Sequence, residues 1–579
     1  MDINTSSEFY KSNVLGQRSG LYVLFFTEMW ERFSFYGMRV LLIQFLTATV
    51  LNGGWAWSAE QAGALYGTYA MMLYLTPILG GIIADKYIGS RQAVIIGAII
   101  MTIGHAAMAF DTQIMFFIGL ACLVIGTGFF KPNMPSILGE MYKDLPEKKD
   151  GAYTIFYMGV NAGAFFGMML CGYLAEKIGW HWGFGLAGVF MFLGTLQFVF
   201  AKPLMGNLGV LDKSPEAQEN ALKNDTDKRN PFTTTDLALI GIVAVIGFLY
   251  AFNDPLSKNG IIDIFAWLDM PFLRGQYVII IVALILFIYL IVSRILRYDK
   301  VVRDRMFAVV LLAFFLIFFF MSFEQGATSL VIVARDFIDR SLTGSALTIF
   351  NIVNALLTIV PLAIITWVLA KLAKATWSKI ALSNVILFAC FALIWGAAIW
   401  MLNNEFSKES SEITVSWFST LNSFFIIALA STVSKLWESK YNPSAAFKYG
   451  FGLILVSVGF LIIGLGSWGI GEGVKISMVF LILTYLFHTL GELFISPVGL
   501  SYVSKLVPAR MLAFMFGIWY LAIAIAQKVA AVLGGQVEKI QEEYSISHFF
   551  FLFTAIPAVA GLLVMLLNPL IKKLMHGIK

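Results

Sequence analysis

The sequence predicts an all-α membrane protein that crosses the bilayer many times. Of its 579 residues, 59% are hydrophobic and only 13% are charged, whereas charged residues make up about a quarter of an ordinary soluble domain. Sixteen apolar segments are each long enough to cross a hydrocarbon core of about 30 Å as a helix. This composition excludes an ordinary soluble protein, and the net charge of +5 is spread over loops and does not indicate nucleic-acid binding.

The loops between the predicted spans carry their Lys and Arg residues unevenly. Counted from a cytoplasmic N-terminus, most of the 40 basic residues fall in inner loops, as the positive-inside rule requires. We therefore expect both termini in the cytoplasm, the chain in the plasma (inner) membrane in contact with lipid, and no cleaved signal peptide. The spans lie near residues 21–51, 61–84, 92–110, 113–135, 153–175, 183–201, 236–252, 276–296, 306–330, 344–370, 380–402, 413–437, 447–468, 475–500, 511–533 and 548–570.

The first span carries ionisable residues inside an otherwise apolar helix. Glu28, Arg32, Tyr36 and Arg39 share one face at helical spacing, and Glu31 borders that face. A charge exposed at the bilayer centre costs at least about 2.5 kcal/mol, so the stripe must face protein or water. One interpretation is a structural ion pair between helices. The other is a cluster that carries a proton, because two acids share one arginine and one carboxylate lacks a full partner.

The end of the fourth span places a lysine beside two helix-breaking residues. Lys131 is followed by Pro132 and Pro135, and it still lies at membrane depth. An interrupted backbone at that depth is tolerated where protein or a water-filled cavity satisfies it. This favours a lysine that lines a cavity over one that extends to the interface.

The fifth span combines small residues with polar ones. Gly159, Gly163 and Gly167 recur every four residues, a spacing typical of close helix packing. Tyr157 and Asn161 share another face of the same helix. From the residues alone, Asn161 is as well explained by a hydrogen bond between helices as by a substrate contact.

The second half of the chain has two isolated acids in its spans. Glu324 follows an apolar run, where it either caps a helix end or pairs with a charge in the first half. Glu492 and Ser496 lie one helical turn apart on a common face, where an acid could bind an ammonium group. His488 precedes Glu492 by four residues, but no third ligand accompanies them and we predict no metal site.

These residues lie in segments that resemble the motifs of the proton-dependent oligopeptide transporter family, a branch of the major facilitator superfamily. The stretch 26–37 resembles the E-x-x-E-R-F-x-Y-Y-G signature, with Phe35 in place of the first tyrosine. A later stretch, 417–423, keeps the asparagine of its motif at Asn422 but has serines at two other positions. Further resemblances occur, in family order, at residues 80–91, 126–135, 156–163, 323–330 and 488–501.

The resemblance implies the architecture of the chain. The major facilitator fold consists of two six-helix bundles, and the sixteen predicted spans leave four additional helices. We expect these four helices to bury no charge, to lie outside the twelve-helix core and to make no substrate contact. The implied divisions are an N-terminal bundle at 1–203, a cytoplasmic linker at 204–235, an accessory helix pair at 236–300, and a C-terminal bundle at 301–579 with an inserted pair at about 344–402.

The resemblance also implies the function, a proton-coupled symporter that imports di- and tripeptides by alternating access. A carrier of varied peptides must bind the two termini that all peptides share. Arg32 and Lys131 would bind the carboxylate, and Glu492 would bind the amine with Asn161 and Asn422. Further substrate contacts are expected from Tyr36, Tyr74, Ser496 and Trp519.

Proton coupling is implied for the first span and for Glu324. Protonation of Glu28 or Glu31 would release Arg32, which the resemblance pairs with Glu324 to close the outer gate. Protons are then the coupling ion, and we expect no cofactor, no metal and no catalytic residue. We expect a monomer whose partners are peptides, protons and lipid.

Three alternatives remain open at this point. A carrier of another small anion, such as nitrate, would have no use for a deep acid that binds an amine. A non-transporting nutrient sensor is disfavoured only by the lack of a long signalling tail. An intramembrane enzyme is disfavoured because the sequence contains neither H-E-x-x-H nor G-x-S-x-G.

Overall fold

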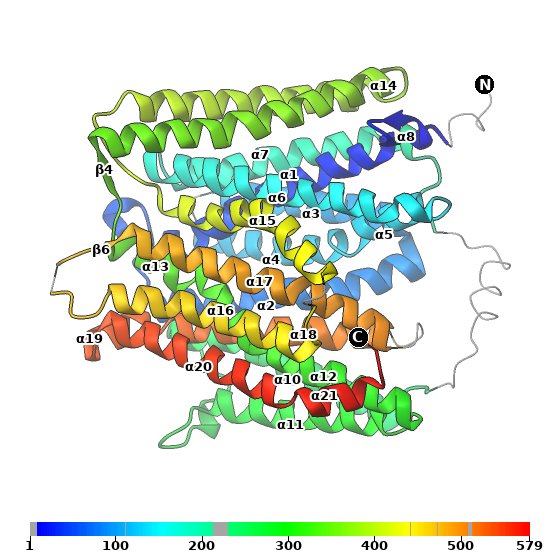
Figure 1. Ribbon diagram of the computed structural model, residues 1–579, viewed down its shortest axis with the longest axis vertical. Coiled ribbons are helices and arrows are strands. Elements are labelled where there is room, and N and C mark those ends of the chain that lie inside the picture. The colour runs from blue at the N-terminus through cyan, green and yellow to red at the C-terminus, as the bar shows by residue number, and fades with distance from the viewer. Residues whose placement is uncertain are drawn as a thin grey trace.

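The structure is a computed structural model in which long helices run side by side across the molecule (Figure 1). It describes residues 8–110, 112–211, 230–439, 442–471, 473–507 and 512–578. Fourteen helical stretches in these residues are long and apolar enough to cross a membrane. One of them contains two antiparallel legs, and the charged first helix adds another, so all sixteen predicted spans are present. The predicted all-α fold is confirmed.

The first six-helix bundle follows a short N-terminal segment. The elements are η2 (Phe9–Lys11), α1 (Ser19–Thr47), η3 (Val50–Asn52), α2 (Ala59–Ile83), the π-helix η4 (Ala84–Ile88), α3 (Ser90–Met108), α4 (Gln113–Phe130), α5 (Asn133–Met141), α6 (Pro146–Lys177), α7 (Trp180–Phe200) and α8 (Lys202–Met205). Helix α1 packs on α6 and α7, and α3 packs on α4.

The second bundle begins with a helix that is interrupted near its end. A 3-10 turn separates the two parts of this helix and carries Glu324. The elements are α12 (Lys300–Phe323), η6 (Glu324–Ala327), α13 (Ser329–Asp336), α15 (Val415–Glu438), α16 (Ala445–Gly466), α17 (Met478–Leu506), α18 (Leu512–Gly534), α19 (Val537–Glu543), α20 (Ile546–Leu566) and α21 (Asn568–Met575).

The four additional helices form two hairpins. The accessory hairpin consists of α10 (Thr234–Lys258), η5 (Ala266–Leu268) and α11 (Gly275–Ile295). The inserted hairpin is α14 (Gly344–Phe406), which reverses at Ile380, where the backbone leaves the helical region. Figure 1 shows α14 and α11 at opposite ends of the long axis of the molecule. The predicted linker at 204–235 lies mainly outside the described residues.

In the part of the chain that the structure describes, three pairs of very short strands connect the loops. β4 and β5 pair where the chain enters and leaves α14, which makes this hairpin a closed insertion. β3 and β6 pair in parallel and join the segments that follow α13 and precede α17. The strands are β1 (Asn13–Val14), β2 (Gln17–Arg18), β3 (Ile338–Asp339), β4 (Ser341–Thr343), β5 (Ser410–Glu412) and β6 (Ile476–Ser477).

The glycine spacing of the fifth span brings α6 against α1, as predicted. A Cβ atom on Gly163 would lie 2.2 Å from the backbone oxygen of Met29, and one on Gly167 would lie 2.2 Å from that of Phe33. No larger residue fits at either position without moving the two helices apart. These contacts flank Glu31 and Arg32, so close packing fixes the position of the charged face of α1.

The prediction that the additional helices bury no charge is wrong. Asp236 and Arg294 of the accessory hairpin pair at 2.9 Å with both side chains buried, and Asp254 is fully buried. Glu405 of α14 is also buried and accepts a hydrogen bond from Tyr173 at 2.7 Å. Hydropathy averages over a span, so it does not reveal ions near helix ends that are paired in three dimensions.

Candidate functional site

The charge cluster predicted on the first span is present on α1. Arg32 Nε lies 2.8 Å from Glu28 Oε1 and 2.8 Å from Glu31 Oε2. All three side chains are buried, with at most 8% of any side chain exposed. The two acids therefore share one guanidinium away from bulk water, which confirms the predicted arrangement of charges.

Part of this cluster lacks hydrogen-bond donors. Glu28 Oε2 and Glu31 Oε1 are buried without a hydrogen-bond partner among the described residues, and Glu31 Oε2 has only the ion pair with Arg32, which does not have the geometry of a hydrogen bond. Native interiors satisfy nearly all such atoms, and an ionised carboxylate without donors is costly to bury. Protonation of one acid would lower that cost, so the cluster has the chemistry of a proton acceptor.

A central cavity of about 390 Å³ lies beside the cluster and is lined by cations of the first bundle. Arg32, Arg39 and Lys131 line it together with Tyr36 and Tyr74. The Lys131 ammonium lies 4.2 Å from the centre of the Tyr74 ring, which is a cation–π contact. Three cations around one cavity suit the binding of a carboxylate or another small anion.

Close helix contact explains why Lys131 and Tyr74 meet. α4 ends at Phe130 and α5 begins at Asn133, so Lys131 occupies the predicted break between them. α2 approaches α4 so closely that a Cβ atom on Gly80 would lie 1.9 Å from the backbone oxygen of Gly128. The structure thus brings Lys131 to a cavity wall, as the proline spacing predicted.

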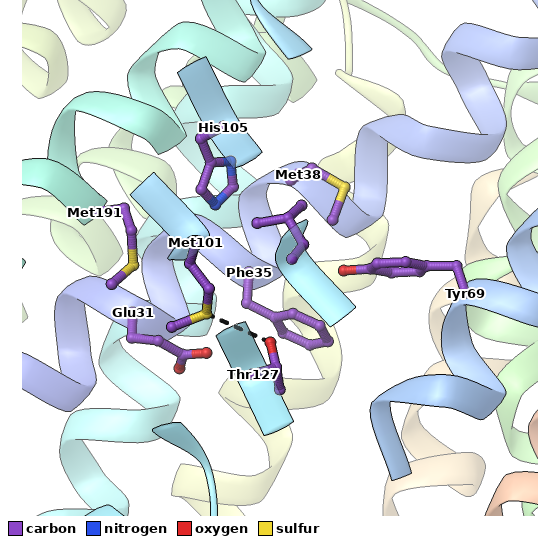
Figure 2. A pocket seen from close by; sticks show the side chains of 9 residues that line it. Glu31, Phe35, Met38, Tyr69, Met101, His105, Thr127 and Met191 are labelled. Atoms are coloured by element: carbon purple, nitrogen blue, oxygen red, sulfur yellow. Dashed lines mark hydrogen bonds between the residues drawn. The ribbon is translucent and has the colours of Figure 1, made fainter. Parts of the chain in front are cut away.

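A second, smaller cavity has Glu31 in its wall, as Figure 2 shows. It encloses about 210 Å³ between α1, α2, α3, α4 and α7. Its walls include His105 and Tyr69, whose Nδ1 and hydroxyl atoms are buried without a hydrogen-bond partner among the described residues. Thr127 lines both cavities and donates to the sulfur of Met101 at 3.4 Å. Glu31 is thus set between protein groups, away from lipid.

The second bundle contributes an acid held by an amide. Asn422 Nδ2 donates to Glu492 Oε2 at 2.9 Å and to Thr489 Oγ1 at 3.1 Å. One turn from Glu492, the buried Ser496 hydroxyl has no hydrogen-bond partner among the described residues. Trp519 is buried against Gly499. None of these side chains lines the 390 Å³ cavity.

Asn161 has a local partner in the structure. Its Nδ2 donates to the backbone oxygen of Tyr157, one turn earlier on α6, at 2.9 Å. The two residues lie one turn apart on α6, at the predicted helical spacing. Only 7% of Asn161 is exposed, and a contact between this amide and a substrate stays a prediction.

The predicted pair between Arg32 and Glu324 is wrong in this structure. Glu324 instead forms an ion pair with Arg39, whose Nε also donates to the Tyr66 hydroxyl at 2.7 Å. Arg39 lies two helical turns beyond Arg32, which brings it level with η6. Arg32 is paired through Nε with the two acids of its own helix instead.

Several residues at these cavities were not predicted from the sequence to act there. Arg39 lies on the predicted stripe, but the family resemblance assigned the pair with Glu324 to Arg32. Gln527 lines the central cavity and is buried on α18. His105 had no partner at a recognisable spacing. A single polar residue in an apolar span carries no signal of its own, so Gln527 and His105 required the structure.

The fold and the site define a membrane carrier of the two-bundle type, with a charged cavity lined mainly by the first bundle. The chain belongs to the POT family, whose model matches residues 91–411 and 386–551. It is 31% identical to the peptide transporter YePEPT of Yersinia enterocolitica over 96% of this chain and 94% of the relative. It is 27% identical to a di-/tripeptide transporter of Lactococcus lactis, over 97% and 98%.

Further comparisons agree with this assignment. The transporter YclF of Bacillus subtilis is 30% identical over 97% of this chain and 96% of its own length. A crystal structure of the peptide transporter POT in complex with sulfate superposes with a TM-score of 0.72 at 27% identity and covers both chains fully. A POT structure in complex with alafosfalin also has a TM-score of 0.72, at 26% identity, with full coverage of both.

Proposed function

We propose that this protein is a proton-coupled symporter that imports di- and tripeptides by alternating access. The observation that carries the proposal is that the two bundles supply side chains of opposite charge. Arg32 and Lys131 lie on the first bundle, and Glu492 lies on the second. A peptide at neutral pH has a carboxylate at one end and an ammonium at the other, so it can join the two bundles through both ends.

The side-chain contacts favour separate roles for the two ends. Lys131 has no carboxylate within ion-pair distance among the described residues, so its charge is available to a substrate carboxylate. Asn422 orients the Glu492 carboxylate and leaves its other oxygen for an ammonium. Tyr36 and Tyr74 would form side walls, with Asn161, Ser496 and Trp519 as further contacts when the bundles approach.

Glu28 and Glu31 are the proposed proton carriers. Protonation of either acid would weaken its pairing with Arg32 and allow that guanidinium to bind the peptide carboxylate. Proton and peptide would then favour the same state. The Arg39–Glu324 pair replaces the expected Arg32–Glu324 pair as the contact that joins the bundles across the cavity.

The remaining parts of the proposal concern the setting of the carrier. Lysine and arginine in the loops support cytoplasmic termini and a plasma (inner) membrane location. We propose that the chain works as a monomer in lipid, with protons as its coupling ion and without a metal or another cofactor.

The test is uptake of a labelled dipeptide into proteoliposomes. An imposed inward proton gradient should drive accumulation above the external concentration, and a protonophore should abolish it. Nitrate should neither compete with the dipeptide nor be accumulated. Accumulation that ignores the proton gradient would contradict coupling, and a failure to bind any peptide would contradict the substrate class.

A further inference from the structure

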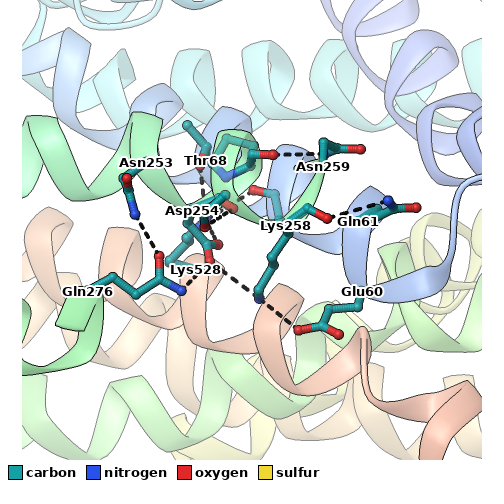
Figure 3. A network of polar contacts seen from close by, with 12 residues as sticks. Glu60, Gln61, Thr68, Asn253, Asp254, Lys258, Asn259, Gln276 and Lys528 are labelled. Atoms are coloured by element: carbon teal, nitrogen blue, oxygen red, sulfur yellow. Dashed lines mark hydrogen bonds and ion pairs between the residues drawn. The ribbon is translucent and has the colours of Figure 1, made fainter. Parts of the chain in front are cut away.

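A buried ion cluster joins the accessory hairpin to both bundles, as Figure 3 shows. Asp254 of α10 is fully buried and lies 2.5 Å from the ammonium of Lys528 on α18. Lys258, one turn along α10, lies 3.3 Å from Asp254 and 3.6 Å from Glu60 at the start of α2. Gln276 of α11 donates to Asp254 at 3.2 Å. The cluster therefore joins four helices.

Lys528 also crosses the boundary between the two bundles. Its ammonium donates to the backbone oxygen of Ala64 at 3.0 Å and to the hydroxyl of Thr68 at 2.9 Å, both on α2. The helices are in close contact here, because a Cβ atom on Gly63 would lie 2.6 Å from the backbone oxygen of Ala531. Lys528 is thus a second-bundle cation whose described partners all lie on the first bundle and the hairpin.

The hairpin is fastened to the first bundle at this end. The Thr68 hydroxyl donates to the backbone oxygen of Ala251, and Gln61 donates to that of Lys258 at 3.4 Å. At its other end, α11 leads directly into α12 of the second bundle. The hairpin therefore contacts both bundles, and its end beside Lys528 is attached to the first bundle.

We propose that Asp254 and Lys528 are positioning residues of the transport cycle, and that their ion pair holds the two bundles together at the end where α2 begins. In alternating access the bundles separate first at one end and then at the other. Separation of α18 from α2 at this end moves Lys528 away from a carboxylate that stays with α2. The pair must break in that step, so it favours the state closed at this end.

The position of Lys528 also connects the Asp254–Lys528 pair to the central cavity. The preceding residue, Gln527, lines that cavity, and α2 supplies Ala70 and Tyr74 to the same wall. A movement that releases Lys528 therefore changes the cavity wall directly. This inference rests on alternating access in the proposed function but requires neither a peptide substrate nor a proton.

The test is a distance measurement by double electron–electron resonance on the full chain. Spin labels go on Leu51→Cys and Lys539→Cys, two exposed positions at this end of the first and second bundles, with the native cysteines replaced by serine. Asp254→Asn should raise the population with the longer distance several-fold. Lys528→Met should do the same, and the double variant should open no further than the worse single variant.

Asp236→Asn is the matched control. It removes a buried carboxylate of the same hairpin, but the ion-pair partners of that carboxylate, Arg294 and Arg297, lie within or directly after α11. Its distance distribution should match that of the parent. Equal distributions for Asp254→Asn, Lys528→Met and the parent would overturn the proposal and leave the pair a structural one. Shifted distances in a protein that transports no peptide would contradict the proposed substrate but would still support the proposed role of the Asp254–Lys528 pair.

Discussion

The two bundles carry different kinds of polar side chains, and the central cavity is lined by the first bundle and by Gln527 of the second. The first bundle presents three cations, and two of them are already paired, Arg32 with Glu28 and Glu31, and Arg39 with Glu324. The second presents an acid, Glu492, held only by neutral donors. A cation with competing partners can exchange one partner for another, whereas a single acid can only bind or release its ligand. We therefore expect variants of the acids beside Arg32 to affect coupling and variants of Glu492 to affect binding alone.

The largest effect should come from Arg32→Ala. This change leaves two buried acids without their shared cation, and breaking a buried pair costs about 3–5 kcal/mol. A cost of that size corresponds to a loss of at least about 100-fold in transport activity. Proton-driven uptake and counterflow of labelled against unlabelled peptide should both fail. Arg91→Ala is the control, because Arg91 contacts the backbone of Gly206 at 2.5 Å, away from the cavity.

A selective loss is expected for Glu31→Gln and Glu28→Gln. The neutral amide cannot take up a proton, so uptake driven by a pH gradient should fall to background. Counterflow needs no net proton movement and should continue within about 2–3-fold of the parent. Glu405→Gln removes a buried carboxylate from α14, which contributes no residue to the cavity wall, and should keep both activities. If both α1 variants still concentrate peptide under a proton gradient, Glu324 or Glu492 must carry the proton instead.

The α1 cluster was predictable because its residues lie on one helix. The spacing of Glu28, Glu31 and Arg32 fixes their relative positions before any tertiary contact forms, and the prolines around Lys131 do the same for the helix break. The helix spans were predictable for the same reason, since each depends on a continuous apolar run. Relative positions that are set within one helix do not change when the helices pack together.

Contacts between helices were not predictable in the same way. Glu324 can reach any cation level with η6, and only the vertical offset of α1 decides between Arg32 and Arg39. Asp254 gave no signal because its partner, Lys528, lies more than 270 residues away on another bundle. The pairing of two isolated charges across helices requires the packing of those helices, which the order of residues does not contain.

Glu492→Gln should produce an intermediate effect confined to one end of the substrate. A hydrogen bond to a charged group contributes about 1.5–3 kcal/mol, so KM for free dipeptides should rise about 10- to 100-fold. N-acetylated peptides lack the ammonium and should be transported as by the parent. Proton-driven accumulation of peptides at saturating concentration should remain. An equal loss for free and acetylated peptides would show that Glu492 does not bind the amine.

The smallest effect on transport should come from the lipid-facing side of the inserted hairpin. Val360 lies midway along the first leg of α14, is 50% exposed, and belongs to a hairpin that contributes no residue to the central cavity as lined in the structure. Val360→Lys places a charge at membrane depth, at a cost of about 2.5–3.5 kcal/mol on insertion. Membrane yield and thermal stability in detergent should therefore fall, while KM of the protein that does insert stays within about twofold of the parent. Val360→Leu keeps the surface apolar and should change neither quantity. A raised KM in Val360→Lys at unchanged yield would mean that α14 acts on the cavity through α6 and α7, and the distinction between a working core and a supporting hairpin would fail.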